Sequence, residues 1–401
     1  MTRKRQVLAF LMAGAADPGS EAAAQSLTLY GRLYPEVILT RMTGATAPGT
    51  AGLSTLAGAP SGSSFDSVTK MDASNSRFGV RGEEPLGNGV RAFFQVESRI
   101  LVDTGNPPNT GIASRDTFVG VSSERHGLVK FGNMDTVYKS IGDTLSFLGV
   151  SSGNFVSNSS VLAKQGFGES SAGSFHLRRT NALWYETPSW NGLQWMVQYG
   201  PDEARTTTRN AWLGSTGVLY DSAQVYAALS YEHHHDFFGG SRNVPAALAN
   251  TSNQNAHSSD WSSRGTLQYR WSNHTVEGNV AYTRYAETGG AVGRFRDHRH
   301  WSGALSLDSK WSDAWRTAAS VDVSASGSCS LFGGVPCRTD GLEGHQLSLG
   351  AAYYLSRRTS VFALYAKLWN GRSAQYNNVD GIDMPVGADP QQLAVGLMHS
   401  F

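Results

Sequence analysis

Apolar and polar residues alternate along most of the chain in short segments. In one such segment Leu347, Leu349 and Tyr353 share one face, while Gln346 and Ser348 share the other. A period of two residues predicts β-strands with one apolar and one polar face. A half-buried strand of a soluble sheet shows the same alternation, so this pattern alone leaves a soluble β-protein and a membrane barrel both open.

The connections between these segments are alternately short and long. Short turns rich in Gly, Asn, Asp or Ser are expected at residues 83–88, 123–126, 189–192, 221–223, 272–273, 312–314 and 356–358. These seven turns alternate with eight longer polar loops. Outer-membrane barrels keep their periplasmic turns short and their external loops long. The pattern therefore predicts an all-β fold, a 16-stranded antiparallel transmembrane β-barrel.

Aromatic residues gather near the expected turns. Those in or beside a turn are Trp190, Tyr220, Trp271, Trp311, Trp315 and Tyr354. Trp and Tyr are enriched where a barrel meets the lipid headgroups. Trp184 and Trp195 fall within strands, so the placement is a tendency, but it favours the membrane barrel over the soluble sheet.

The composition excludes a helical membrane protein. The chain has 401 residues, 45 of them Gly, and a mean hydropathy of −0.30. Beyond its N-terminal region it has no run of about 18 apolar residues, which a membrane-spanning helix would need. Turn signals recur at strand spacing throughout and no linker divides them, so we expect one barrel domain over residues 25–401.

A signal peptide is predicted at residues 1–24. Basic residues 3–5 precede an apolar stretch at 7–16, and the small residues 22–24 suit cleavage. An N-terminal amphipathic helix of the mature protein is the alternative, but the Asp-Pro-Gly sequence at 17–19 would break it. We therefore expect an exported protein.

The charge balance argues against nucleic acid as a partner. The net charge is +1, and removing the predicted signal peptide takes away three basic and two acidic side chains, which leaves no net charge. A nucleic-acid-binding domain normally carries a basic excess.

Four segments carry a resemblance to a known family. They read SLTLYGR (26–32), SRFGVRGEEPLGNGVRAFFQVE (76–97), YYLSRRTSVFALYAKLWN (353–370) and AVGLMHSF (394–401). In this order they resemble the trimeric general porins of beta-proteobacterial outer membranes. The resemblance implies a homotrimer in outer-membrane lipid and lipopolysaccharide, with three water-filled pores for passive diffusion of small hydrophilic solutes and ions.

The resemblance also implies a pore constriction. Porins of this family fold the third external loop into the lumen, opposite arginines of the barrel wall. The matching residues here are Asp135 and Asp143 near the start of that loop, and Arg77, Arg115 and Arg178 on the wall. Charges that line a narrow pore select ions by sign, so we expect an anion preference.

Strand alternation supports these positions unequally. Arg77 lies opposite the apolar side chains of Phe78 and Val80, as a lumenal residue should. Arg178 lies opposite Leu183 in the same way, whereas Arg115 shares its side with Val119 and is less well supported. The alternative for each arginine is a solvated side chain at the rim.

Alternation alone adds Arg32, Arg91 and Glu97 as further lumenal residues. The sequence also departs from the family in two places. Asn133 stands where an arginine is common, which weakens the expected anion preference, and Pro85 stands where an aspartate is usual in the first periplasmic turn.

Two other groups of residues suggest chemistry outside the pore. Cys329 and Cys337 lie in the seventh external loop of an exported protein, where a disulfide is favoured over two free thiols. The residues 233–236 read His-His-His-Asp, but adjacent histidines cannot close a metal site without remote ligands, so a hydrated loop is favoured and no metal is predicted.

No enzyme activity and no cofactor are predicted. The chain has no H-E-x-x-H zinc motif and no Walker-type phosphate loop. An outer-membrane barrel enzyme whose catalytic residues are brought together by folding, and a barrel adhesin that acts through its loops, remain the alternatives to a pore.

Overall fold

The computed structural model describes residues 26–46, 65–73, 75–106, 111–142, 148, 154–168, 171–203, 205–379 and 384–401. The predicted signal peptide and Asp143 lie outside these residues.

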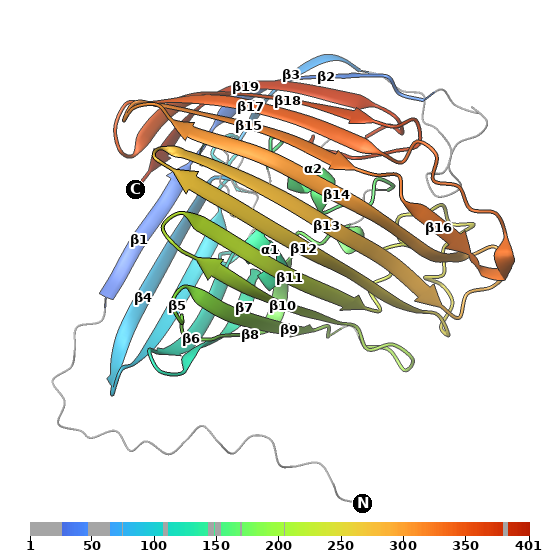
Figure 1. The fold of residues 1–401 in the computed structure, drawn as a ribbon, viewed down its shortest axis with the longest axis horizontal. Coiled ribbons are helices and arrows are strands. Elements are labelled where there is room, and N and C mark those ends of the chain that lie inside the picture. The colour runs from blue at the N-terminus through green and yellow to red at the C-terminus, as the bar shows by residue number, and fades with distance from the viewer. Residues whose placement is uncertain are drawn as a thin grey trace, which may run out of the picture.

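The regular secondary structure of the described residues is almost entirely antiparallel strand (Figure 1). The strands are β1 (Ser26–Leu33), β2 (Glu36–Thr43), β3 (Phe65–Asp72), β4 (Arg77–Gly87), β5 (Val90–Arg99), β6 (Thr117–Ser123), β7 (Gly127–Asp135), β8 (Arg178–Glu186), β9 (Leu193–Pro201), β10 (Trp212–Asp221), β11 (Val225–His235), β12 (His257–Trp271), β13 (His274–Thr288), β14 (Phe295–Lys310), β15 (Trp315–Ser324), β16 (Ser328–Leu331), β17 (Gly344–Tyr354), β18 (Thr359–Asn370) and β19 (Asp389–Ser400). The helical segments are α1 (Val137–Gly142), α2 (Ser159–Leu162), η1 (Ser171–Gly173) and η2 (Phe332–Gly334).

The described strands form one closed barrel whose wall the chain crosses sixteen times. Each crossing, made by one strand or by two consecutive strands, is called a stave below. β1 and β2 together cross the wall once, as do β3 and β4, while the short β16 lies in a loop and pairs with β14. Each stave pairs with its neighbour in sequence, and β19 pairs with both β1 and β2, which closes the ring. The predicted 16-stranded antiparallel barrel is confirmed.

The first turn differs from the prediction. β4 continues to Gly87, and the turn is the dipeptide Asn88–Gly89, with φ values of 52° and 72°. Two positive φ values suit a type I′ hairpin turn, which is why an Asn-Gly pair occurs here. The placement of Pro85 in the turn was wrong, because it lies in β4 beside a register shift, where a missing N–H disturbs the ladder little.

The two faces of the wall differ as the alternation predicted. Leu229, Leu267 and Leu305 are each at least 60% exposed on the outer face, next to polar side chains that are buried on the inner face. Near the loop end of the strands the aromatic rings of Tyr231, Trp261, Tyr282 and Trp301 contact one another in sequence across four strands. No helix in the described parts of the chain is long and apolar enough to cross a membrane.

The barrel closes beside an aromatic side chain. The backbones of Gly31 and Phe401 exchange two hydrogen bonds of 3.1 Å. A Cβ atom on Gly31 would lie 2.3 Å from the Phe401 ring, so only glycine fits there without a shift of the ring.

Candidate pore constriction

The third external loop, residues 136–177, is called L3 below, and its described parts lie against the inner side of the barrel wall. Its first turn, α1, contacts the inner side of β9, β10, β11 and β12. The backbone N–H of Tyr138 donates to Ser215 Oγ at 2.9 Å, and the Tyr138 hydroxyl is 2.8 Å from Ser262 Oγ. The Tyr226 hydroxyl donates to the Ile141 carbonyl at 2.6 Å. These contacts hold α1 against the wall.

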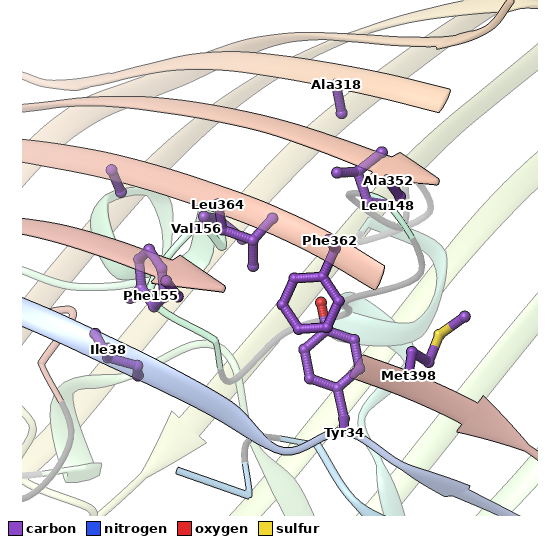
Figure 2. Packing of buried hydrophobic residues seen from close by; sticks show 12 residues of the cluster. Tyr34, Ile38, Leu148, Phe155, Val156, Ala318, Ala352, Phe362, Leu364 and Met398 are labelled. Carbon is purple, nitrogen blue, oxygen red and sulfur yellow. The ribbon is translucent and has the colours of Figure 1, made fainter. Parts of the chain in front are cut away.

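The middle of L3 packs on a distant part of the same wall. Figure 2 shows Leu148, Phe155 and Val156 of L3 beside apolar side chains of β2, β17, β18 and β19. The Tyr34 ring stacks on that of Phe362 at a centroid distance of 4.3 Å within this cluster. L3 therefore reaches from the α1 contacts to the strands at which the barrel closes.

Polar contacts add to this packing. Asn154 Nδ2 donates to Glu36 Oε1 at 2.8 Å, and Gln346 Nε2 donates to the Ser157 carbonyl at 3.0 Å. Ser302 Oγ donates to the carbonyl of Leu162 in α2 at 3.2 Å. Because these inner-face groups are bonded to L3, the polar inner face beneath the loop is buried.

Burial shifts two titratable groups of L3. Desolvation raises the pKa of Tyr138 to about 12, so its hydroxyl stays protonated and can donate. Desolvation, followed by the positive charges of Lys139 and Arg264, holds the pKa of His176 well below its usual range. His176 is therefore neutral when L3 is seated at neutral pH.

The predicted charged residues pair with one another on β1 and β4 to β8, strands with which α1 and α2 make few contacts. Arg77 Nε lies 3.6 Å from Glu97 Oε2, and Arg115 Nε lies 2.6 Å from Glu97 Oε1. The Tyr30 hydroxyl donates to the same carboxylate at 3.1 Å. Glu97 thus fixes the heads of two arginines from different segments.

A second group continues the first. Arg178 Nε lies 2.5 Å from Asp116 Oδ1, and Arg178 Nη2 lies 2.9 Å from Asp135 Oδ1. Lys139 Nζ of α1 lies 2.9 Å from Asp135 Oδ1, so this group joins the wall to L3. The side chains of Arg77, Arg115 and Arg178 are 19–22% exposed, which leaves them accessible to solutes in the lumen, whereas Glu97 is buried.

The charge of this wall is positive on balance. The two groups contain three wall arginines and three carboxylates, and Lys139 of L3 and Arg32, which lies opposite Arg77 in the β1–β4 ladder, add two further cations. Neighbouring arginines repel each other unless anions screen them. The wall can therefore attract small anions.

The predicted pore residues that the structure describes fall in two places. Arg32, Arg77, Arg115, Arg178, Glu97 and Asp135 lie together on the charged wall. Arg91 shares the inner face of β5 with Glu97 but lies next to the first turn, where it is 49% exposed and 3.6 Å from Glu83. Asp135 belongs to the end of β7 and not to L3, because it pairs with Arg178 in the ladder.

Two details of the site escaped the sequence. Arg115 precedes β6 in a bend, so the strand alternation that placed it beside Val119 does not apply to it. Asp116 was missed although it follows Arg115 directly, and it contacts Arg178 at the start of β8, on the far side of β7. Asn133 takes no charged role: its Nδ2 donates to the Arg115 carbonyl at 2.9 Å and supports that bend.

Comparison with known proteins now decides the family. The family model described as Gram-negative porin matches residues 8–373. The chain belongs to the Gram-negative porin family. Outer membrane porin protein 32 of Delftia acidovorans is 25% identical to this porin over 345 residues, which cover 82% of this chain and 85% of the relative. An outer membrane porin protein of Bordetella pertussis is 29% identical over 169 residues, 39% of this chain and 41% of that protein.

Solved structures agree with the fold. The anion-selective porin from Comamonas acidovorans superposes with a TM-score of 0.67 and 20% identity, covering 94% of this chain and 100% of that one. OmpT of Vibrio cholerae in a trimer form gives a TM-score of 0.61 at 13% identity. This porin is accordingly an outer-membrane β-barrel, and its apolar outer face is the lipid-facing one.

Proposed function

We propose that this porin forms a water-filled channel through the outer membrane for passive diffusion of small hydrophilic solutes and ions, with a preference for anions. The observation that carries the proposal is the partly exposed charged wall, with Arg77, Arg115 and Arg178 held by carboxylates beside an inward-folded L3. Arginine heads fixed in a narrow aqueous path stabilise anions more than cations.

We also propose that the mature protein begins after residue 24, assembles as a homotrimer in lipid and lipopolysaccharide, and has no catalytic role. The family membership supports these points, and the trimer form of the Vibrio protein supports the assembly. Mass spectrometry of protein extracted from outer membranes tests the cleavage site. Migration on gels of samples with and without prior heating tests the trimer.

The channel is tested by recording from purified protein in a planar bilayer under a KCl gradient. We expect steps in groups of three and a zero-current potential that shows an anion preference. An Arg77→Ala, Arg178→Ala double variant should reduce that preference. The matched control is Arg91→Ala, which removes an arginine from the same inner surface near the first turn.

The outcomes separate the parts of the proposal. Folded protein without conductance would overturn the pore. Conductance with a cation preference would keep the pore and overturn the role of the arginines. An equal loss of anion preference in the double variant and in the control would place the selectivity elsewhere.

A further inference from the structure

The strongest unexplained group lies on the outside of the barrel, where β11 ends and β12 begins. It consists of His235, Asp236 and His257, which among the described residues could together hold a metal ion. One ligand atom from each of these side chains lies within 4.8 Å of the other two. His235 shares the outer face of β11 with Leu229 and Tyr231. The group is therefore outside the lumen and independent of the pore.

We propose that His235, Asp236 and His257 bind a divalent transition-metal ion of the zinc type. The fifth external loop, residues 236–256, brings His257 back to the two adjacent residues. The sequence argument against a metal was that adjacent histidines lack a remote ligand, and His257 is such a ligand. Two imidazoles and one carboxylate form a donor set that suits Zn²⁺.

The distances fit a shared ion. His257 Nδ1 lies 3.1 Å and 3.2 Å from the two carboxylate oxygens of Asp236, and His235 Nε2 lies 3.4 Å from Asp236 Oδ2. Ligands bound tetrahedrally to zinc at about 2.1 Å are separated by about 3.4 Å. A small movement of the imidazoles, and no change of the backbone, would place the three atoms around one ion.

The surroundings hold these side chains in place. The Ser258 backbone N–H donates to Asp236 Oδ1 at 3.1 Å, and the Asp236 backbone N–H donates to the Ser258 carbonyl at 3.0 Å. Asp236 has a φ of 60°, and this left-handed conformation, which Asp adopts more readily than most residues, ends β11 there. Hydrogen bonds of this kind orient metal-binding carboxylates.

The rings are also stacked. The His235 ring packs on Trp212 at 5.6 Å with an interplanar angle of 22°, and on His257 at 6.3 Å with an angle of 16°. Asp236 is buried, whereas the side chains of His235 and His257 are 35% and 42% exposed. An ion can thus enter from the external medium between the two imidazole rings and reach the carboxylate of Asp236, which is already held in place. Three protein ligands would leave a fourth coordination position for water.

Zinc binding to the untagged full-length trimer tests the proposal. We expect calorimetry at pH 7.5 to show one Zn²⁺ per chain, and Co²⁺ to give the visible absorption of a tetrahedral site. Loss of a group that only orients a ligand costs about 10–100-fold in affinity, so His257→Gln and Asp236→Asn should each weaken zinc binding by at least about tenfold. His345→Gln is the matched control, since His345 is an exposed histidine near the loop end of β17.

Lowering the pH from 7.5 to 5 should release the ion, because protonated imidazole cannot bind it. Wild-type protein without saturable zinc binding would overturn the proposal, as would unchanged affinity in both site variants. Equal weakening by His345→Gln would show binding to scattered surface histidines. The single-channel conductance of each variant shows that it has folded, and if a variant fails to fold, the wild-type stoichiometry and Co²⁺ spectrum decide.

Discussion

The two halves of the barrel interior use inward-facing polar residues in different ways. On β9, β10, β12, β14 and β17 some of these residues hydrogen-bond to L3 and are buried, as Ser215, Ser262 and Gln346 show. On β4 to β8 and beside them, arginines and carboxylates pair with one another, and most of them stay partly exposed. The first half is a seat for the loop, and the second is the surface that we propose solutes meet.

The difference shows that alternation along a strand identifies which residues face the interior. It does not show which of those residues are exposed to water and which are covered by L3. Ser262 and Glu97 have the same inward orientation, yet one contacts a loop tyrosine and the other holds two arginines. The course of L3 decides which inner residues meet water. Four changes can break or sharpen this distinction.

The largest effect is expected from removing the apolar side chains of L3 that pack on the barrel wall. The double variant Phe155→Ala, Val156→Ala removes the loop side chains packed beside Phe362 and Ile38. Truncation of a buried Phe alone costs about 3–5 kcal/mol, so the middle of L3 should detach and single-channel conductance should rise and fluctuate. Phe131→Ala is the control, because that ring is 54% exposed on the outer face. An unchanged conductance would show that the seat does not set the width of the pore.

Opposite charge changes on the solute surface should give opposite shifts of selectivity. Glu97→Gln leaves Arg77 and Arg115 without their shared carboxylate and should raise the anion preference, whereas Arg178→Gln leaves two carboxylates and should lower it. One unit charge near 4 Å in a water-like medium is worth about 1 kcal/mol, which corresponds to a factor of about five in the permeability ratio. Reversal potentials in KCl gradients measure both variants, and shifts of the same sign would contradict the assignment.

Acid should loosen the seat through His176. Its pKa is lowered in the folded protein, so the seated loop is stable at pH values above the ordinary histidine pKa and loses stability as the pH falls below it. We expect channel noise to increase between pH 7 and pH 5 in the wild type. His176→Gln should reduce this increase, since a glutamine does not titrate. Equal acid sensitivity in both proteins would assign the effect to other groups.

The smallest effect is expected from the disulfide between Cys329 and Cys337, which are eight residues apart in the seventh external loop. A disulfide that closes so short a loop removes little conformational entropy from the unfolded chain. It therefore stabilises the folded protein by less than about 3 kcal/mol. The two cysteines are only partly buried, at the edge of a cluster that includes Phe167 and Phe175 of L3. Reduction, or the double variant Cys329→Ser, Cys337→Ser, should therefore leave conductance and selectivity unchanged while proteolysis of that loop becomes faster.

Local patterns predicted the wall well. Strand alternation and turn residues depend on neighbours in sequence, so they gave the sixteen staves and most of the turns. The error at Pro85 was also local, because a bulge allowed β4 to continue through it. Where a bend interrupted the strand, as at Arg115, alternation gave the wrong face.

The site depended on contacts that no local pattern contains. Asp116 meets Arg178 across 62 residues of sequence, and His257 meets Asp236 only after the fifth loop has returned. The resemblance to porins supplied the inward third loop and its facing arginines. It also supplied Asp135, which holds Arg178, but it did not supply Asp116 or the position of Arg91 beside the first turn.

The seat of L3 also imposes an order of events on assembly. Its Asn154 bonds to Glu36, 118 residues earlier, and its Ser157 carbonyl accepts from Gln346, 189 residues later. Each contact closes a loop of more than 100 residues, which has an entropic cost unless the intervening strands are already ordered in the wall. We therefore expect L3 to take its seat after the wall has formed, so that the constriction is the last part of the channel to mature.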